Sequence, residues 1–287
     1  MSYKFFNSII STHRKRFNSL KVFLRSILIS SKYVDKNSFE IIITDLGKNL
    51  KVDNLIASYS DKLNIKHCKV GFNGIFWKSK ALNHCVLNSE GKYITMIDID
   101  SLVPPSFLIG IKDFFSNPNM NRTKLCHRVR YLDVRESKRV ADGNFNEEYI
   151  KKHLIGKAKK HRLAWERYTK NENKLRTFTK PQTRWFAGEA LGNSHFTMKK
   201  KYYLEVGGYD ERFVGWSCED MDFNRRVFAY LGSGYLIASP KYTIFSVYHT
   251  RSDWMSVKNT KKNTKMYQRS KKNGVIKLPI EENWGVF

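Results

Sequence analysis

Two aspartates stand one residue apart at the end of an apolar run, in the segment Ile97-Asp98-Ile99-Asp100. Residues 93–97 are typical of a buried strand, and side chains two residues apart on a strand point to the same side. Ligands bind at the carboxyl ends of strands in α/β sheets. Carboxylate oxygens there suit a hard divalent cation, and such a cation suits a diphosphate. Taken alone, the two acids could equally be solvated side chains at a strand end.

A second acid pair, Glu219-Asp220, opens a helical pattern after glycine-marked turns at 207–208 and 215. Acids in the first turn of a helix commonly do no more than stabilise the helix dipole. The pair therefore gains functional weight only in combination with the strand-end aspartates.

These acids are held by a chain that begins with alternating strand and helix patterns. Strands are expected at 5–11, 39–44, 65–70 and 92–98, and helices at 20–28, 52–59 and 79–88. Such alternation predicts right-handed crossovers and a mainly parallel sheet flanked by helices. At 287 residues and 41% apolar content, the chain can build a substantial core.

Composition excludes several classes of protein. No apolar run approaches the length of a transmembrane helix, and no signal-peptide pattern opens the chain. The four cysteines form no C-x-x-C pair, which argues against structural zinc and favours a reduced, cytoplasmic setting.

The chain is strongly basic, with 52 Lys+Arg against 26 Asp+Glu and a net charge of +26. Residues 120–182 hold 18 Lys+Arg against 7 Asp+Glu, and a basic helix or helix pair is expected over 146–168. Residues 258–277 hold eight Lys+Arg and no acid. This segment could be an ordered lid or a tail that becomes ordered when it binds a polyanion. This charge predicts a polyanionic partner. The lysines expected to contact it are Lys157, Lys159, Lys160, Lys261, Lys262 and Lys265. Lysine-rich codon usage is the simpler alternative, although it leaves the scarcity of acids unexplained.

The order of these features resembles the family 2 glycosyltransferases with the GT-A fold. The shared elements are an opening strand, an acid after the second strand, a strand ending in Asp-x-Asp, and Gly-Trp-x-x-Glu-Asp some 120 residues later. Residues 192–226 look more like the galactosyl- and N-acetylgalactosaminyltransferases, which carry Gly-Trp-Gly-Gly-Glu-Asp. The resemblance implies one GT-A domain with a nucleotide-binding half (1–117), a basic insertion (118–183), an acceptor and catalytic half (184–250) and a basic C-terminal segment (251–287).

The resemblance also implies a donor site for a UDP-sugar and a metal, Mn²⁺ or Mg²⁺. Asp100 would bind the metal, with Asp98 over the ribose and donor sugar and His249 as a further ligand. Asp45 would hold the uracil edge. Side chains expected to face the nucleotide are Thr12, His13, Arg14, Lys80 and Asn83. Two departures weaken the uracil assignment: Leu46 replaces the usual second acid, and the usual proline of the first strand is missing.

On the acceptor side, Asp220 aligns with the general base and Glu219 with its neighbour at the donor sugar. Trp216 would wall the acceptor pocket, together with Trp185 and Gly192. One metal and one base suit a single displacement with inversion.

Three hypotheses remain for the acceptor. The favoured one is a hydroxymethylated base in double-stranded DNA, as in some phages, with the reaction in the host cytoplasm and the base flipped out of the duplex. The second is a bacterial surface or lipid-linked glycan at an anionic membrane. The third is a non-catalytic nucleic-acid-binding protein on a transferase fold, against which the intact acids argue. No obligate protein partner is evident.

Overall fold

The first half of the chain alternates strands and helices in the computed structural model, which describes residues 6–155, 176–178, 189–232, 234–236, 243–248 and 257–287. The periodicity is confirmed, with small shifts at the ends of elements. The elements are β1 (Asn7–His13), α1 (Phe17–Ser31), η1 (Lys36–Ser38), β2 (Phe39–Asp45), α2 (Leu50–Ala57), β3 (Ile65–Lys69), α3 (Lys78–Leu87), β4 (Tyr93–Met96), β5 (Ser101–Leu102) and α4 (Phe107–Ser116).

The second half adds antiparallel strands and a further helical layer. Its elements are η2 (Pro118–Met120), β6 (Lys124–Tyr131), α5 (Val134–Ala141), α6 (Glu147–Tyr149), η3 (Ile150–Ile155), β7 (Arg176–Phe178), β8 (Glu189–Lys199), α9 (Lys200–Glu205), α10 (Glu219–Leu231), β9 (Gly234–Leu236), β10 (Ile244–Ser246) and α11 (Val257–Lys272). The helix expected over 146–168 is helical in its described part, where α6 continues directly into the π-helix η3; the remainder lies outside the described residues.

One mixed sheet runs through the molecule in the order β3-β2-β1-β4-β8-β6-β10-β5, with β7 and β9 attached beside β6. Strands β3, β2, β1 and β4 are parallel, and β8 pairs antiparallel with both β4 and β6. The predicted α/β class is confirmed: the sheet is mixed and parallel in its first half.

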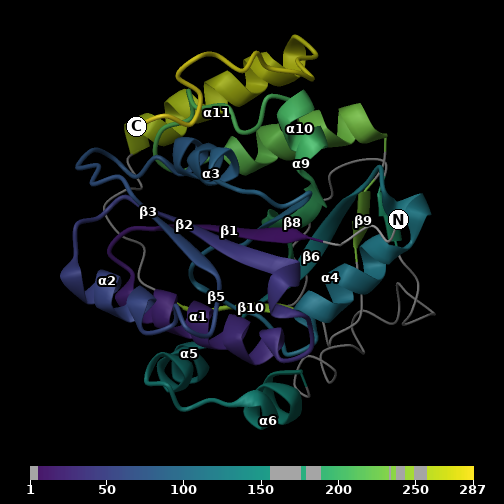
Figure 1. Ribbon diagram of the computed structural model, residues 1–287. Helices are drawn as coiled ribbons and strands as arrows, with labels where there is room; N and C mark the ends of the chain where they lie inside the picture. The colour runs from purple at the N-terminus through teal and green to yellow at the C-terminus, as the bar shows by residue number, and fades with distance from the viewer. Residues whose placement is uncertain (1–5, 156–175, 179–188, 233, 237–242, 249–256) are drawn as a thin grey trace.

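Helices cover both faces of the sheet (Figure 1). On one face, α1 and α4 pack through residues such as Phe23 and Phe107 against Ile9 and Ile41. On the other face, α3, α9 and α10 pack against Ile10 and Ile42, and α11 lies over α10. Strand residues are therefore apolar on both faces, which is typical of the buried part of an α/β sheet.

Among the described residues, no helix combines the length and hydrophobicity that crossing a membrane requires.

Candidate active site

The strand-end aspartates each face a cation. Asp98 and Asp100 lie between β4 and β5, at the carboxyl end of β4. Asp98 pairs with Lys78 Nζ at 3.1 Å and accepts a hydrogen bond from Ser194 Oγ at 2.7 Å. Asp100 pairs with Arg16 Nη1 at 2.8 Å. Side chains from three separate segments therefore converge where the sequence predicts a diphosphate and metal site.

Lys78, the first residue of α3, joins this strand end to α10. Its Nζ lies 3.1 Å from Asp98 Oδ1 and 3.1 Å from Asp220 Oδ2. Burial would lower the pKa of Lys78, but the carboxylates of Asp220 and Asp98 outweigh burial and raise the pKa well above its ordinary value. Burial alone would raise the pKa of Asp98, and the Lys78 ammonium brings it below the usual range. Lys78 and Asp98 are therefore both ionised at neutral pH.

The two acids at the start of α10 have different surroundings. Glu219 is 5% exposed, and its Oε2 has no hydrogen-bond partner among the described residues. Burial, followed by the charge of Asp220, raises the pKa of Glu219 to about 7. Asp220 is partly exposed, and it accepts a hydrogen bond from the Tyr209 hydroxyl at 2.8 Å as well as the Lys78 contact. Asp220 is therefore the accessible carboxylate of the pair.

A series of hydrogen bonds through Ser194, His195 and Ser101 orients the Asp98 side chain. Ser194 Oγ lies 3.1 Å from His195 Nδ1, and His195 Nε2 lies 2.9 Å from Ser101 Oγ. Burial lowers the pKa of His195 and outweighs the nearby carboxylates. A neutral imidazole donates through one nitrogen and accepts through the other, so this series of hydrogen bonds can order the Asp98 side chain without adding charge.

The turn before α10 has a backbone conformation that favours glycine. Ser217 and Cys218 have φ angles of 109° and 67°. Gly215 N donates to Phe76 O at 3.1 Å, and Asn263 of α11 donates to Trp216 O at 3.3 Å. Trp216 is 40% exposed beside the acid pair. Contacts on both sides therefore hold a strained turn at the entrance to the acids.

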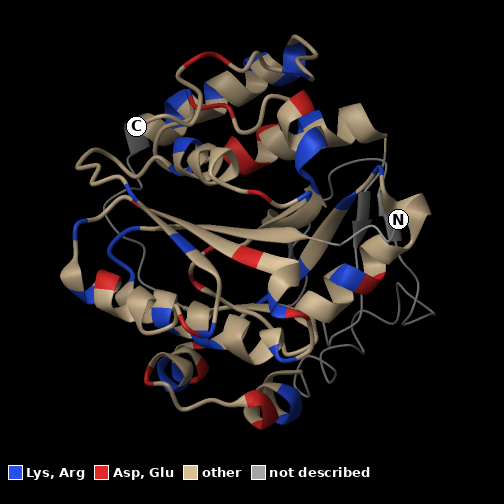
Figure 2. Ribbon diagram, viewed as in Figure 1, with Lys and Arg blue, Asp and Glu red and all other residues tan. Residues whose placement is uncertain are grey.

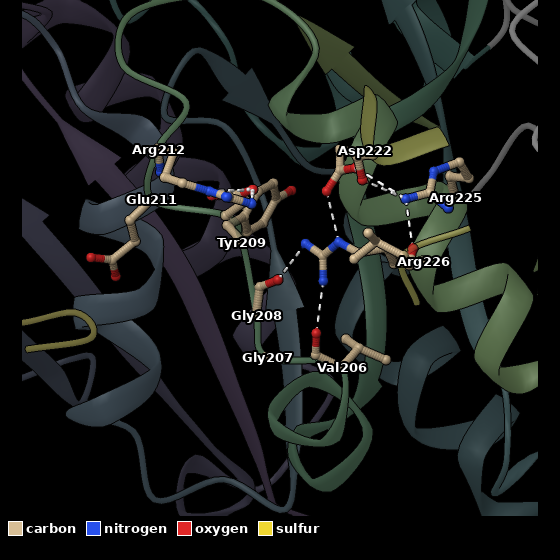
Figure 3. A network of polar contacts seen from close by, with 12 residues as sticks. Val206, Gly207, Gly208, Tyr209, Glu211, Arg212, Asp222, Arg225 and Arg226 are labelled. Atoms are coloured by element: carbon tan, nitrogen blue, oxygen red, sulfur yellow. Dashed lines mark hydrogen bonds and ion pairs between the residues drawn. The ribbon is translucent and has the colours of Figure 1, made fainter. Parts of the chain in front are cut away.

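A buried arginine attaches the first turns of α10 to the preceding loop (Figure 3). Arg226 is fully buried and donates to Asp222 Oδ2, Val206 O and Gly208 O, each at 2.7 Å. Gly208 has φ 60°, and a Cβ there would lie 2.5 Å from Trp284 and 2.7 Å from Asn83. The loop leading to Tyr209 is therefore fixed to α10, and with it the hydroxyl that binds Asp220.

The residues predicted for the nucleotide base gather at the ends of β1, β2 and β3. Asp45 Oδ1 lies 3.0 Å from His13 Nδ1, and Asp45 Oδ2 lies 3.4 Å from His67 Nε2. Burial alone would raise the pKa of Asp45, but the hydrogen bonds of His13 and His67 bring it well below its usual range. Thr12 is buried beside them and Arg14 is partly exposed. A cavity of about 470 Å³ opens next to the cluster, lined by Gly47, Lys48, Asn49, Leu50, Asp53, Lys69, Val70 and Gly71.

Within the described residues, this cluster also contains a group of possible metal ligands. One donor atom each of Asp45, Asp53 and His67 lies within 4.8 Å of the others. Asp53 already pairs with Lys69 Nζ at 2.8 Å, and Asp45 accepts from Gly47 N at 2.9 Å. These groups pair with one another and with Lys69, just as Asp98 and Asp100 pair with Lys78 and Arg16, so the metal site at the strand-end pair stays a prediction.

Two residues predicted to face the nucleotide, Asn83 and Lys80, are engaged within the protein, and their nucleotide role stays a prediction. Asn83 is fully buried, and its side chain is engaged by Tyr209, Glu211 and Tyr203. Lys80 lies over the rings of Trp77 and Phe287 and 3.9 Å from Glu211. Both side chains serve the packing of α3 against the 209–211 loop and the last residues of the chain.

Lys78, which sequence reasoning missed, is the lysine of α3 that contacts Asp98 and Asp220. Residues two apart on a helix are rotated by about 200° around its axis and so point about 160° apart, which means that an error of two positions nearly reverses the face. Arg16, Ser194 and Tyr209 were also missed. The basic residues directly after β1 and at the start of α3 were the signal that could have found Arg16 and Lys78.

Several predicted site residues lie outside the described residues: His249, Trp185, Lys157, Lys159 and Lys160. Of Gly192, only its place in β8 is described. The remaining predicted contacts, Lys261, Lys262 and Lys265, are exposed on α11.

Comparison with known proteins extends these observations. A hyaluronan synthase of Pasteurella multocida is 26% identical over 216 residues, which cover 67% of this chain and 20% of that protein. S. aureus TarS (residues 1–349) has a TM-score of 0.56 at 13% identity, with 84% of this chain and 60% of that chain covered. The mannosyltransferase PcManGT from Pyrobaculum calidifontis, in complex with GDP-Man and Mn²⁺, has a TM-score of 0.52 at 14% identity, with 88% and 59% covered. This chain therefore spans a fifth of the curated relative and about three fifths of the two solved chains.

These likenesses confirm the expected GT-A fold. The sequence profile described as "Glycosyltransferase like family 2" matches residues 18–237, which is most of the chain. With this match and the acids at the predicted strand and helix ends, the chain belongs to the family 2-like glycosyltransferases.

Proposed function

We propose that this protein transfers a sugar from a UDP-sugar to a hydroxyl group of its acceptor, with inversion at the anomeric carbon. The observation that carries the proposal is the convergence of Asp98 and Asp220 on Lys78 Nζ, each at 3.1 Å. That contact places a strand-end carboxylate, suited to the donor diphosphate, beside the partly exposed carboxylate at the start of α10. Within this scheme, residues 1–117 are the nucleotide-binding half and residues 184–250 the acceptor half.

The donor side would hold the diphosphate and a divalent cation. The oxygens of Asp98 and Asp100 are the hard ligands that Mn²⁺ or Mg²⁺ prefers, so the donor set fits such an ion. A bound divalent cation would supply charge neutralisation for the leaving diphosphate. Arg16 and Lys78 already lie at this position and can bind phosphate oxygens, while Asp45 and the neighbouring cavity are available to the base.

On the acceptor side, Asp220 would take the proton of the attacking hydroxyl. Lys78 and the Tyr209 hydroxyl fix both oxygens of Asp220, so the carboxylate is oriented before the acceptor arrives. Glu219, with a pKa near 7, can donate a hydrogen bond to the donor sugar when it is protonated. Trp216 would provide an exposed ring at the acceptor entrance.

The charge of the chain supports a hydroxymethylated base in double-stranded DNA as the acceptor. The exposed lysines of α11 lie on the helix that contacts the Trp216 turn, and blue bands mark the helix in Figure 2. A second candidate is a polysaccharide hydroxyl, which the name of the hyaluronan synthase relative favours.

One experiment separates these acceptors. Nucleoside-diphosphate release is measured with UDP-sugars and GDP-mannose, in Mn²⁺ or EDTA, with hydroxymethylcytosine duplex, unmodified duplex or oligosaccharides. Sugar transfer to the modified duplex alone supports the DNA acceptor, whereas transfer to an oligosaccharide alone replaces it with the glycan. A chain that releases no nucleotide from any donor contradicts the proposed activity.

The metal prediction is tested by binding as well as by turnover. Asp100→Asn should abolish turnover in ordinary Mn²⁺ and weaken the Mn²⁺ affinity measured by electron paramagnetic resonance. Asp113→Asn, on the exposed side of α4, is the matched control and should change neither quantity. Full wild-type turnover in EDTA would contradict a metal at Asp100.

The base prediction separates rate from binding. Asp220→Asn should lower kcat by at least about 10²-fold, because general-base catalysis typically contributes about 10²- to 10⁴-fold. UDP affinity, measured by calorimetry, should change little. Wild-type kcat in this variant at saturating acceptor would remove Asp220 from the base role.

A further inference from the structure

The exposed side of α11 carries an unbalanced row of cations. Between residues 257 and 280 the sequence contains no Asp or Glu. The exposed cations of the helix are Lys261, Lys262, Lys265, Arg269, Lys271 and Lys272. Within the described part of the chain, none of them forms an ion pair with a carboxylate.

These cations repel one another when the helix forms. Lys265 lies four residues from both Lys261 and Arg269 and three residues from Lys262. Like charges at these spacings are neighbours on a helix surface and destabilise it. Neutralisation of the row would therefore favour the helical state of residues 257–272.

The inner side of α11 contacts the Trp216–Cys218 turn before Glu219. Asn263 is 1% exposed, and its Nδ2 donates to Val214 O at 3.1 Å and Trp216 O at 3.3 Å. Further along, Ser270 Oγ donates to Asp222 Oδ1 of α10 at 2.7 Å. α11 therefore contacts both the turn before Glu219 and the helix that begins there.

The turn needs such support because of its backbone conformation. Ser217 and Cys218 both have positive φ, which costs free energy for residues other than glycine. A conformation of this kind persists only when the surroundings impose it. Loss of the Asn263 contacts would free the turn and, with it, the direction of Asp220.

From these contacts we propose that α11 is a brace that responds to nucleic acid: duplex DNA on its outer, basic side stabilises the helix, and its inner side then holds the Trp216–Cys218 turn in the catalytic conformation. The proposal rests on the proposed function for the role of Asp220. The duplex binds the folded helix more tightly than the unfolded segment because the cations are close together only in the helix, and this difference in affinity is what shifts the equilibrium.

The spacing of the cations is compatible with a row of nucleic-acid phosphates. Lys261, Lys265 and Arg269 recur every four residues, about 6 Å apart along the axis at 1.5 Å per residue. A strand of duplex DNA carries a phosphate about every 3.4 Å, so each cation can meet a phosphate.

Hydrogen exchange of the full chain tests the brace without any turnover. Exchange is measured for peptides covering 257–272 and 214–220. The full chain is compared alone and with unmodified 20-base-pair duplex, heparin or anionic lipid vesicles. The duplex should slow exchange in both peptides by about fivefold, which relief of three like-charge pairs would give at their usual strength. The effect should fade as salt rises.

Three variants separate the outer and inner sides. Lys261→Gln/Lys265→Gln/Arg269→Gln should show slower exchange over 257–272 without duplex, and duplex should add nothing. Lys36→Gln/Lys51→Gln/Lys62→Gln, exposed lysines outside α11, is the matched control and should respond as the wild type does. Asn263→Ala should keep the response of 257–272 and lose that of 214–220.

Several results would overturn the proposal. Protection by heparin or vesicles but not by duplex would assign the outer side to an acidic glycan or a membrane. Protection of 257–272 without 214–220 in the wild type would refute the brace. Because exchange needs no donor, failure of every UDP-sugar with an intact duplex response would refute the proposed function alone.

Discussion

Lys78 holds three carboxylates together, so its removal should destabilise the protein in a way that depends on pH. In Lys78→Met, the carboxylates of Asp98, Asp220 and Glu219, all within 4.0 Å of the missing Nζ, lose their shared cation. The Lys78 side chain is 13% exposed, and removing one partner of a buried pair typically costs about 3–5 kcal/mol. The Asp98 side chain is 34% exposed and partly screened by solvent, so we expect the lower end, about 3 kcal/mol at pH 8.

The dependence on pH follows from the remaining acids. Without the ammonium, the pKa of Glu219 should rise above its wild-type value of about 7. An acid whose folded pKa is raised destabilises the fold above that pKa, and the loss disappears as pH falls and the acid takes up a proton. The deficit of Lys78→Met should therefore shrink between pH 8 and pH 5.5.

Urea unfolding of both proteins at these two pH values measures the effect. Lys80→Met is the matched control, because its Nζ lies 3.9 Å from a single carboxylate, Glu211, and it should cost about 1 kcal/mol with little pH dependence. A deficit below about 1 kcal/mol for Lys78→Met, equal at both pH values, would show that the ammonium does not hold the cluster together.

Two further predictions concern buried ionisable groups. The pKa of Glu219 is raised from 4.5 to about 7, so the wild type should lose stability as pH rises through this window; Glu219→Gln should remove up to about 3 kcal/mol of that loss, seen as a flatter plot of Tm against pH. Lys124 Nζ is buried without a hydrogen-bond partner among the described residues, 4.3 Å from the Phe196 ring centre, and burial lowers its pKa. Lys124→Met should therefore be more stable than the wild type by about 1–3 kcal/mol at pH 7 in urea unfolding, and the gain should shrink as pH rises toward the pKa of an unfolded lysine; an unchanged gain at pH 10 would argue against a charge penalty.

The sheet and the site acids could be predicted from the sequence because their signals are local. Apolar runs such as 39–44 form strands that are buried on both faces. Asp98 and Asp100 directly follow such a run. Glu219 begins a helix where a glycine-marked turn ends, so its position at the N-terminus of α10 also follows from neighbouring residues.

The features that the sequence could not predict depend on which face of a helix a residue occupies and on tertiary contacts. Trp77, the residue before α3, provides no side-chain cap, so nothing local indicated which of Lys78 and Lys80 faces the acids. For the segment 257–272 the sequence left open an ordered lid or a tail that orders on a polyanion, because its helix is fixed by Asn263 and Ser270, whose partners lie about 48 residues earlier. Asn83 was assigned to the nucleotide although its partners lie in the 209–211 loop, beyond any local pattern.

The contacts that define the site have a consequence for how the protein folds. Lys78 meets Asp220 across 142 residues, and Ser194 meets Asp98 across 96. Closure of loops this long is entropically costly, and chains dominated by such contacts fold slowly. The carboxylates become properly paired only after both halves of the chain have come together. During synthesis, a nascent chain that ends before α10 exposes Lys78 without its Asp220 partner, so activity should appear only as the last third of the chain is completed.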